Sequence, residues 1–209
     1  MDQGLGVMEV GVAEAVRADF PQLRLWAGWV AVPPGRKSSP GLLDRLADVD
    51  DRARGLPTGR LRTDPVAASY RAFARQIGLD PDAERNPLEQ LAIERLRVGR
   101  LPSGGPLADA MTVAMLETGV PLWAVASERA TGWLSVDADD EGRLVIAENG
   151  RPLVPLMASP GEELRPPIHR RTPSTAVVYA LQVGKVPTST VEEAFWHLQA
   201  GVADQEIAR

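Results

Sequence analysis

The sequence predicts an α+β protein in which helices pack on a mixed or antiparallel sheet. Apolar runs rich in valine, leucine and tryptophan open the chain and return in its second half. Between them lie segments with apolar residues at helical spacing. Because these helical segments cluster together, the order does not fit repeated parallel βαβ units. We expect residues 1–209 to form a single domain, with 1–68 its least diagnostic part.

The first half of the chain predicts two strands and four helices. The strands cover residues 5–12 and 23–32, and Pro33, Pro34 and Gly35 end the second one. The helices cover residues 40–54, about 65–77, a segment beginning near Asn86-Pro87, and 105–118. Pro40 begins the first of these helices. The last is apolar around almost its whole circumference, so we expect it to be the central buried helix.

Local start and stop signals support the helix over 65–77. Asp64 is a typical N-cap, Pro65 suits the first turn, and Gly78 is a typical C-terminal stop. These three residues define both ends of the segment without any tertiary information.

The second half is richer in strands. They cover residues 120–127, 132–138, 143–149 and 175–183, the last of which is apolar enough to be buried. An amphipathic helix over 189–201 follows, capped by Ser189 or Thr190. We expect residues 202–209 to be a frayed tail.

Composition excludes several classes of site. The chain has no cysteine and two histidines, so disulfides, thiolate metal sites and a cysteine nucleophile are ruled out. No ligand spacing indicates a metal, and no glycine-rich phosphate loop indicates a nucleotide, so we expect no metal and no cofactor. The N-terminus lacks a basic region before an apolar run, and no apolar stretch reaches membrane-spanning length. We therefore expect a cytoplasmic protein with no membrane partner.

The net charge of −5 argues against a protein that holds nucleic acid by phosphate contacts alone, and we expect no DNA partner. A local basic patch is still compatible with contact to one end of a tRNA. Arg71 and Arg75 lie one turn apart on the 65–77 helix, and Arg97 and Arg100 lie in the RLRVGR run at the end of the next helix. We predict that these four arginines contact tRNA. The alternative is that they pair with nearby carboxylates on a solvated surface.

Three stretches carry a resemblance to a known family. They are SYRAFARQIGLDPDAERNPLEQLAIERLRVGRLP (69–102), PLADAMTVAMLETGVPLWAVASERATG (106–132) and, more weakly, the arginine- and threonine-rich loop before a buried strand (165–182). In order and spacing, they resemble free-standing relatives of the tRNA-editing domain, the B3/B4 domain, of the phenylalanyl-tRNA synthetase beta subunit. The resemblance implies a B3/B4-like fold, a tRNA or aminoacyl-tRNA partner, and hydrolysis of a wrongly formed aminoacyl ester in trans.

The chain departs from the family at the positions that recognise the amino acid. Trp123 stands where the synthetase domains carry a histidine, and Thr112 and Gly105 each match an asparagine. Gln182 is the polar residue nearest to the family's glutamate. We predict Asp109, Thr112, Trp123, Arg171 and Gln182 as substrate-binding residues. The alternatives are core packing for Trp123 and a structural hydrogen-bond partner for Asp109.

The segment IHRRTPST (168–175) is the strongest candidate for catalysis. Ester hydrolysis needs an oriented water and donors toward the developing oxyanion, and no dedicated nucleophile. We predict that His169 positions water or moves a proton, that Arg170 and Arg171 grip an oxygen, and that Thr172 and Thr175 donate hydrogen bonds. The alternative is a solvated basic turn whose hydroxyls bond their own backbone.

Three functions are compatible with these residues. The first is a trans-acting aminoacyl-tRNA deacylase. The second is a tRNA- or RNA-binding module without chemistry, and the third is an aminoacyl-tRNA-using transferase on the same fold.

Overall fold

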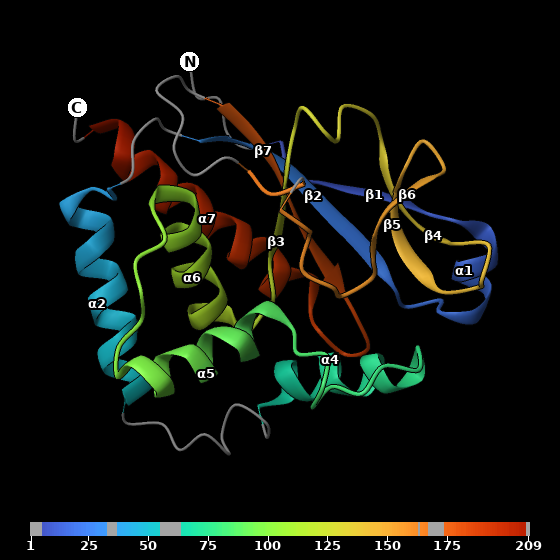
Figure 1. Ribbon diagram of the computed structural model, residues 1–209, viewed down its shortest axis with the longest axis horizontal. Coiled ribbons are helices and arrows are strands. Elements are labelled where there is room, and N and C mark those ends of the chain that lie inside the picture. Colours follow the sequence, from blue (N-terminus) through green and yellow to red (C-terminus); the bar gives the residue numbers. More distant parts are fainter. Residues whose placement is uncertain (1–5, 33–36, 55–63, 163, 167–173, 208–209) are drawn as a thin grey trace.

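The computed structural model shows an α+β fold, with helices packed on one curled sheet (Figure 1). It describes residues 6–32, 37–54, 64–162, 164–166 and 174–207. The strands are β1 (Met8–Val12), β2 (Arg24–Val32), β3 (Trp123–Ala126), β4 (Leu134–Ala138), β5 (Leu144–Glu148), β6 (Arg151–Pro155) and β7 (Ser174–Gln182). The helices are α1 (Glu14–Asp19), α2 (Pro40–Arg54), α4 (Pro65–Gln76), α5 (Pro87–Val98), α6 (Pro106–Thr118) and α7 (Thr188–Ile207).

The sheet has the order β3-β7-β2-β1-β4-β5-β6 and is mixed, as predicted. The β1–β4 pair is parallel, and the other described pairs are antiparallel. β1 divides its pairing, since residues 8–10 bond to β2 and residues 11–12 bond to β4. One short strand therefore joins the two halves of the sheet, which bend away from each other in Figure 1.

The core lies between β7 and the helices α6 and α7. Six consecutive residues of β7, from Ala176 to Leu181, are buried, so this strand is covered on both faces. Nine of the thirteen residues of α6 are buried as well. In Figure 1, α6 and α7 lie together beside the sheet, and α2 packs on their outer side. The prediction that 105–118 is the central buried helix is confirmed.

The starts of α4 and α5 follow the predicted local signals, whereas α7 begins at Thr188, so Ser189 and Thr190 lie inside that helix and the prediction that one of them caps it is wrong. The Asp64 carboxylate accepts hydrogen bonds from the N–H groups of Val66 (2.9 Å) and Ala67 (3.2 Å), with Pro65 in the first turn. The Asn86 side chain accepts from Glu89 N–H at 3.0 Å, and Pro87 opens α5. Both caps satisfy backbone donors that the helix itself leaves unpaired.

Two elements lie outside the predicted set. Strand β6 contains Pro152 and Pro155, which argue against a strand, but β6 is an edge strand, where a missing N–H is tolerated. Helix α1 is a single short piece of six residues between β1 and β2.

Helix α7 continues to Ile207, beyond the predicted end at 201. Gly201, which resembles a stop signal, lies inside the helix where it passes α6. A Cβ atom at this position would come within 2.8 Å of the Ala110 Cβ, so the glycine permits close helix packing. None of the described helices is both long and apolar enough to cross a bilayer.

Arg71 joins α4 to the segment that leads into α5. Its side chain is 9% exposed and makes ion pairs with Glu89 (Nη1–Oε1, 2.6 Å) and Asp82 (Nη2–Oδ1, 2.8 Å). The hydrogen bonds to Asp82 and then to Glu89 raise the pKa of the Arg71 guanidinium. Arg71 therefore holds two helices together from inside the protein.

We expect Arg71→Ala to lower the free energy of unfolding by about 3 kcal/mol, because it leaves Glu89 partly buried without its cation. Urea denaturation measures this change. Arg97→Ala is the matched control, since Arg97 pairs with Glu94 on the surface and its side chain is 75% exposed. Equal stability of the two variants would contradict a structural role for Arg71.

Candidate functional site

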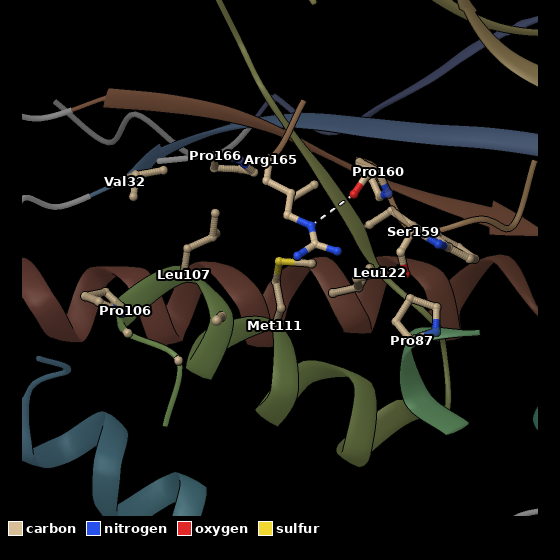
Figure 2. A pocket seen from close by; sticks show the side chains of 15 residues that line it. Val32, Pro87, Pro106, Leu107, Met111, Leu122, Ser159, Pro160, Arg165 and Pro166 are labelled. Atoms are coloured by element: carbon tan, nitrogen blue, oxygen red, sulfur yellow. Dashed lines mark hydrogen bonds between the residues drawn. The ribbon is translucent and has the colours of Figure 1, made fainter. Parts of the chain in front are cut away.

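A cavity of about 250 Å³ lies between the start of α6, the strand β3 and the segment that follows β6 (Figure 2). The residues that line it are Val32, Pro87, Gly104, Gly105, Pro106, Leu107, Ala108, Met111, Leu122, Trp123, Ala124, Ser159, Pro160, Arg165 and Pro166. Of these, Arg165 alone is charged. The volume is below the range of roughly 300–1,000 Å³ that is typical of sites for drug-sized ligands. The cavity therefore suits a group the size of one amino acid.

Arg165 reaches into the cavity from the wall opposite α6. Its guanidinium points toward Met111 in Figure 2, and its Nε donates to the Pro160 carbonyl at 3.0 Å. The Leu164 carbonyl accepts a hydrogen bond from Ala126 N–H at 2.7 Å, which fixes this segment to the edge of β3. No carboxylate among the described residues pairs with Arg165, so its terminal nitrogens offer donors to a ligand.

The turn before α6 is held by Asp109, which is 1% exposed. Its carboxylate accepts hydrogen bonds from the Ser38 hydroxyl (2.5 Å), the Ser103 hydroxyl (2.6 Å) and Gly104 N–H (2.7 Å). One buried side chain thus connects the segment before α2 to the turn that forms one end of the cavity. This arrangement agrees with the structural alternative for Asp109 and places it beside the cavity, outside its lining.

Gly105 is the N-cap of α6 and has φ 94° and ψ 174°. Glycine alone adopts this backbone region without strain. The cap also gives α6 no side-chain hydrogen bond, so the first turn faces the cavity with glycine and proline instead of a capping hydroxyl or carboxylate.

Trp123 forms a fixed part of the cavity wall. It is 2% exposed and stacks on Tyr179 of β7, with ring centroids 5.7 Å apart and an interplanar angle of 9°. Burial raises the pKa of the Tyr179 hydroxyl far above its ordinary value, so the phenol stays protonated. The indole N–H of Trp123 is buried and has no hydrogen-bond partner within the described part of the chain.

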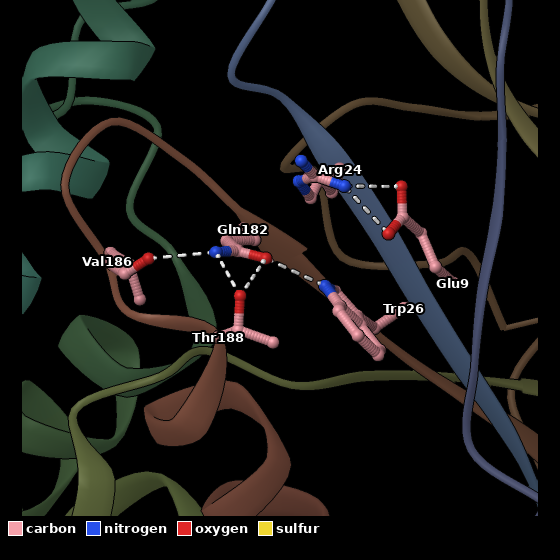
Figure 3. A network of polar contacts seen from close by, with 6 residues as sticks. All are labelled: Glu9, Arg24, Trp26, Gln182, Val186 and Thr188. Carbon is pink, nitrogen blue, oxygen red and sulfur yellow. Dashed lines mark hydrogen bonds and ion pairs between the residues drawn. The ribbon is translucent and has the colours of Figure 1, made fainter.

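Of the other predicted substrate-binding residues, Thr112 and Gln182 lie away from the cavity lining. Thr112 is buried within α6. The Gln182 amide belongs to a network at the start of α7, where it accepts from Trp26 Nε1 (3.0 Å) and donates to Val186 O (3.0 Å) and Thr188 Oγ1 (3.1 Å), as Figure 3 shows. This network connects β2 and β7 to α7. Thr175, predicted as a catalytic hydrogen-bond donor, is exposed on β7, opposite Ala31 of β2, and also lies outside the cavity lining.

The predicted catalytic loop falls largely outside the residues that the structure describes. His169, Arg170, Arg171 and Thr172 lie in the segment 167–173, directly after Pro166 in the chain. Their predicted roles remain predictions. The described residue that precedes this segment and carries comparable chemistry is Arg165.

The predicted tRNA-binding arginines are in two different situations. Arg71 is an internal residue that makes the ion pairs with Asp82 and Glu89 described above. Arg97 pairs with Glu94 on the surface at 2.8 Å, and Arg75 and Arg100 are exposed. The last three keep a surface position from which contact with a phosphate is sterically open.

Arg165, Met111 and Leu122 are site residues that the sequence patterns did not reveal. Leu107 and Met111 are four residues apart and share one side of α6, but so apolar a helix gives no signal that separates a cavity-facing residue from a core residue. The run Arg165-Pro166-Pro167 is a local signal for extended backbone, because the residue before a proline is restricted to extended conformations. It does not by itself indicate a cavity.

No protein-family model matches the chain, and none of the curated proteins matches it significantly. The chemistry of the site therefore has to be argued from its own residues.

We expect Asp109→Ala to lower the free energy of unfolding by about 3 kcal/mol, because the Ser38 hydroxyl and Gly104 N–H lose their acceptor inside the protein. Chemical denaturation measures the loss. Asp44→Ala on the exposed side of α2 is the control and should change stability by less than about 0.5 kcal/mol. A neutral Asp109→Ala would mean that the turn does not depend on this carboxylate.

We expect Gly105→Ala to cost about 1–3 kcal/mol, because alanine is strained at this positive φ. Gly41→Ala is the control. Gly41 lies in α2 with open space around it, and alanine there should leave stability unchanged or raise it slightly. Thermal melts of both variants decide, and the idea fails if Gly105→Ala melts at the temperature of the unsubstituted protein.

Proposed function

We propose that this chain is a B3/B4-like protein that hydrolyses the ester of a mischarged tRNA in trans, with the amino-acid part of the substrate in the cavity beside α6. The proposal joins the resemblance seen in the sequence to a cavity of amino-acid size. It includes a cytoplasmic location, where charged tRNA is used.

One observation carries the proposal. Gly105 and Trp123 match positions at which the synthetase domains carry pocket residues, and both line the same cavity. They lie on different elements, Gly105 at the start of α6 and Trp123 at the start of β3. The meeting of these two positions around one empty space supports a ligand site there, while the other two matched positions, Thr112 and Gln182, lie outside this lining.

The described residues supply part of the chemistry. A water oxygen attacks the ester carbonyl carbon, the bond from that carbon to the ribose oxygen breaks, and the ribose hydroxyl leaves with a proton. The products are a free amino acid and an uncharged tRNA. Arg165 can donate to the oxyanion that forms on the way, which lowers the barrier because the donor is already in place. His169, three residues after Pro166, is the proposed group for moving the proton.

Contact with the tRNA is proposed to run over the exposed arginines Arg75, Arg97 and Arg100. These are few, and the chain is acidic overall, so binding should be weak, and its dependence on salt should be shallow because that dependence scales with the number of phosphates contacted. This fits an enzyme that touches one end of its RNA better than a protein that coats it.

A second candidate is a module that binds aminoacyl-tRNA without hydrolysing it. The described residues that line the cavity include no carboxylate and no imidazole, the groups that most often act as general bases. Binding without release of the amino acid would favour this candidate. An aminoacyl-tRNA-using transferase is the remaining alternative and would require a second substrate.

The test is a panel of correctly and wrongly charged tRNAs incubated with the full chain, with amino-acid release measured over time. We expect one pair to be cleaved. Arg165→Gln should slow that cleavage about 100-fold, as expected for loss of an oxyanion donor. His169→Ala and Arg170→Ala should also slow it.

Arg143→Gln is the matched control, because Arg143 pairs with Asp139 in the turn between β4 and β5, away from the cavity lining. It should cleave like the unsubstituted protein, and circular dichroism checks that all variants are folded. If no tRNA is bound or cleaved, both candidates fail. If cleavage occurs and Arg165→Gln does not affect it, the cavity is not the reaction site.

A further inference from the structure

The cavity wall is built for an apolar group. Its aliphatic part comes from three segments of the chain, β2 (Val32), α6 (Leu107 and Met111) and the residue before β3 (Leu122), and four prolines also line it. The described polar side chains in the lining are Ser159 and Arg165, together with the indole of Trp123. A group buried among these residues therefore finds few hydrogen-bond partners.

The polar groups lie on one side of the cavity. In Figure 2, Arg165, Ser159 and Pro160 lie across from α6, while Leu107 and Met111 rise from α6 itself. The bond from Arg165 Nε to the Pro160 carbonyl attaches the exposed Arg165 side chain to that wall, and its guanidinium points toward Met111. A ligand with one acyl group and one side chain is therefore oriented with its carbonyl oxygen toward Arg165 and its side chain toward Leu107 and Leu122.

Trp123 presents carbon to the cavity. Its indole nitrogen is fully covered by protein atoms, although the residue lines the cavity. The part of the ring that borders the empty space is consequently hydrocarbon. The stack on Tyr179 holds the ring in this position, so turning the N–H toward a ligand would break an aromatic contact in the core.

From these three features we infer that the cavity selects aminoacyl groups with apolar side chains and disfavours those that carry a hydroxyl. The inference rests on the proposed function, since it names the substrate class of the same cavity.

The expected selectivity is moderate. A hydroxyl placed among Leu107, Met111 and Leu122 loses its water without gaining a partner. An apolar pocket that meets an isostere with one added hydroxyl discriminates by at most about 100-fold. Valyl should therefore be preferred to threonyl, and phenylalanyl to tyrosyl where the cavity admits a ring, by about 10- to 100-fold.

The experiment uses two non-hydrolysable probes, the valyl and threonyl amides of 3′-amino-3′-deoxyadenosine. Calorimetric titration of the full chain with each probe gives the ratio of the two dissociation constants. Deacylation of valyl- and threonyl-tRNA is measured in parallel. We expect the valyl probe to bind about 10- to 100-fold more tightly.

Met111→Gln adds an amide to the cavity wall at nearly constant size and should lower the valyl-to-threonyl ratio at least fivefold. Met8→Gln is the matched control, because Met8 is exposed on β1 and does not line the cavity. Val32→Thr, an isosteric change at the opposite wall, gives a second test if Met111→Gln fails to fold.

The outcomes separate the two proposals. Equal or tighter binding of the threonyl probe overturns the inference, whether or not a tRNA is cleaved. Cleavage of tRNA without binding of either probe to the cavity also overturns it and leaves deacylation standing. A valyl preference that Met111→Gln removes, with no cleavage of any tRNA, supports the ligand class and refutes the deacylase.

Discussion

The buried pairing of β7 is the constraint on which the rest of the structure depends. This strand is bonded to β2 along all nine of its residues and to β3 over four of them. Its middle is covered on both faces, so every backbone group there must find its partner in the sheet. Because both faces are packed, a shift of one residue in either pairing would exchange large and small side chains, such as Tyr179 and Ala180, between closely packed positions. The register is accordingly fixed, and with it the position of β3.

The cavity follows from that register. Pairing of Trp123 with Tyr179 brings the two rings into a stack and sets the indole as a wall. The end of β3 then binds the Leu164 carbonyl, which carries Arg165 to the other side of the same space. On the helix side, Asp109 fixes the turn before α6. The cavity is thus bounded by groups that each have a structural reason to stay in place, which is the condition for a preorganised site.

The distribution of polar groups around the cavity indicates the kind of ligand more clearly than the shape of the cavity does. Asp109 is a charged residue close to the cavity, yet its three hydrogen bonds go to the protein and leave the lining apolar. Arg165 is charged and, within the described residues, lacks a carboxylate partner. A single cation facing an apolar wall orients a small acyl group by one oxygen and sorts its side chain by polarity. This combination, rather than any one residue, supports an aminoacyl ligand.

The sequence by itself determined what depends on neighbouring residues. The starts of α4 and α5 were predictable because Asp64-Pro65 and Asn86-Pro87 act on the first turn that follows them. The burial of α6 was predictable because its apolar residues surround the helix, and the α+β class followed from the order of such segments.

Only the tertiary structure decided which segments meet. The sequence suggested a tRNA contact for Arg71 and a substrate contact for Gln182, but the structure surrounds the first with two carboxylates and puts the second in the network at the start of α7. It also extended α7 through Gly201, whose lack of a side chain serves close packing on Ala110. Arg165 reached the cavity through the pairing of β3 with a strand fifty residues later. Such pairings depend on contacts between distant residues, and no local pattern of residues encodes them.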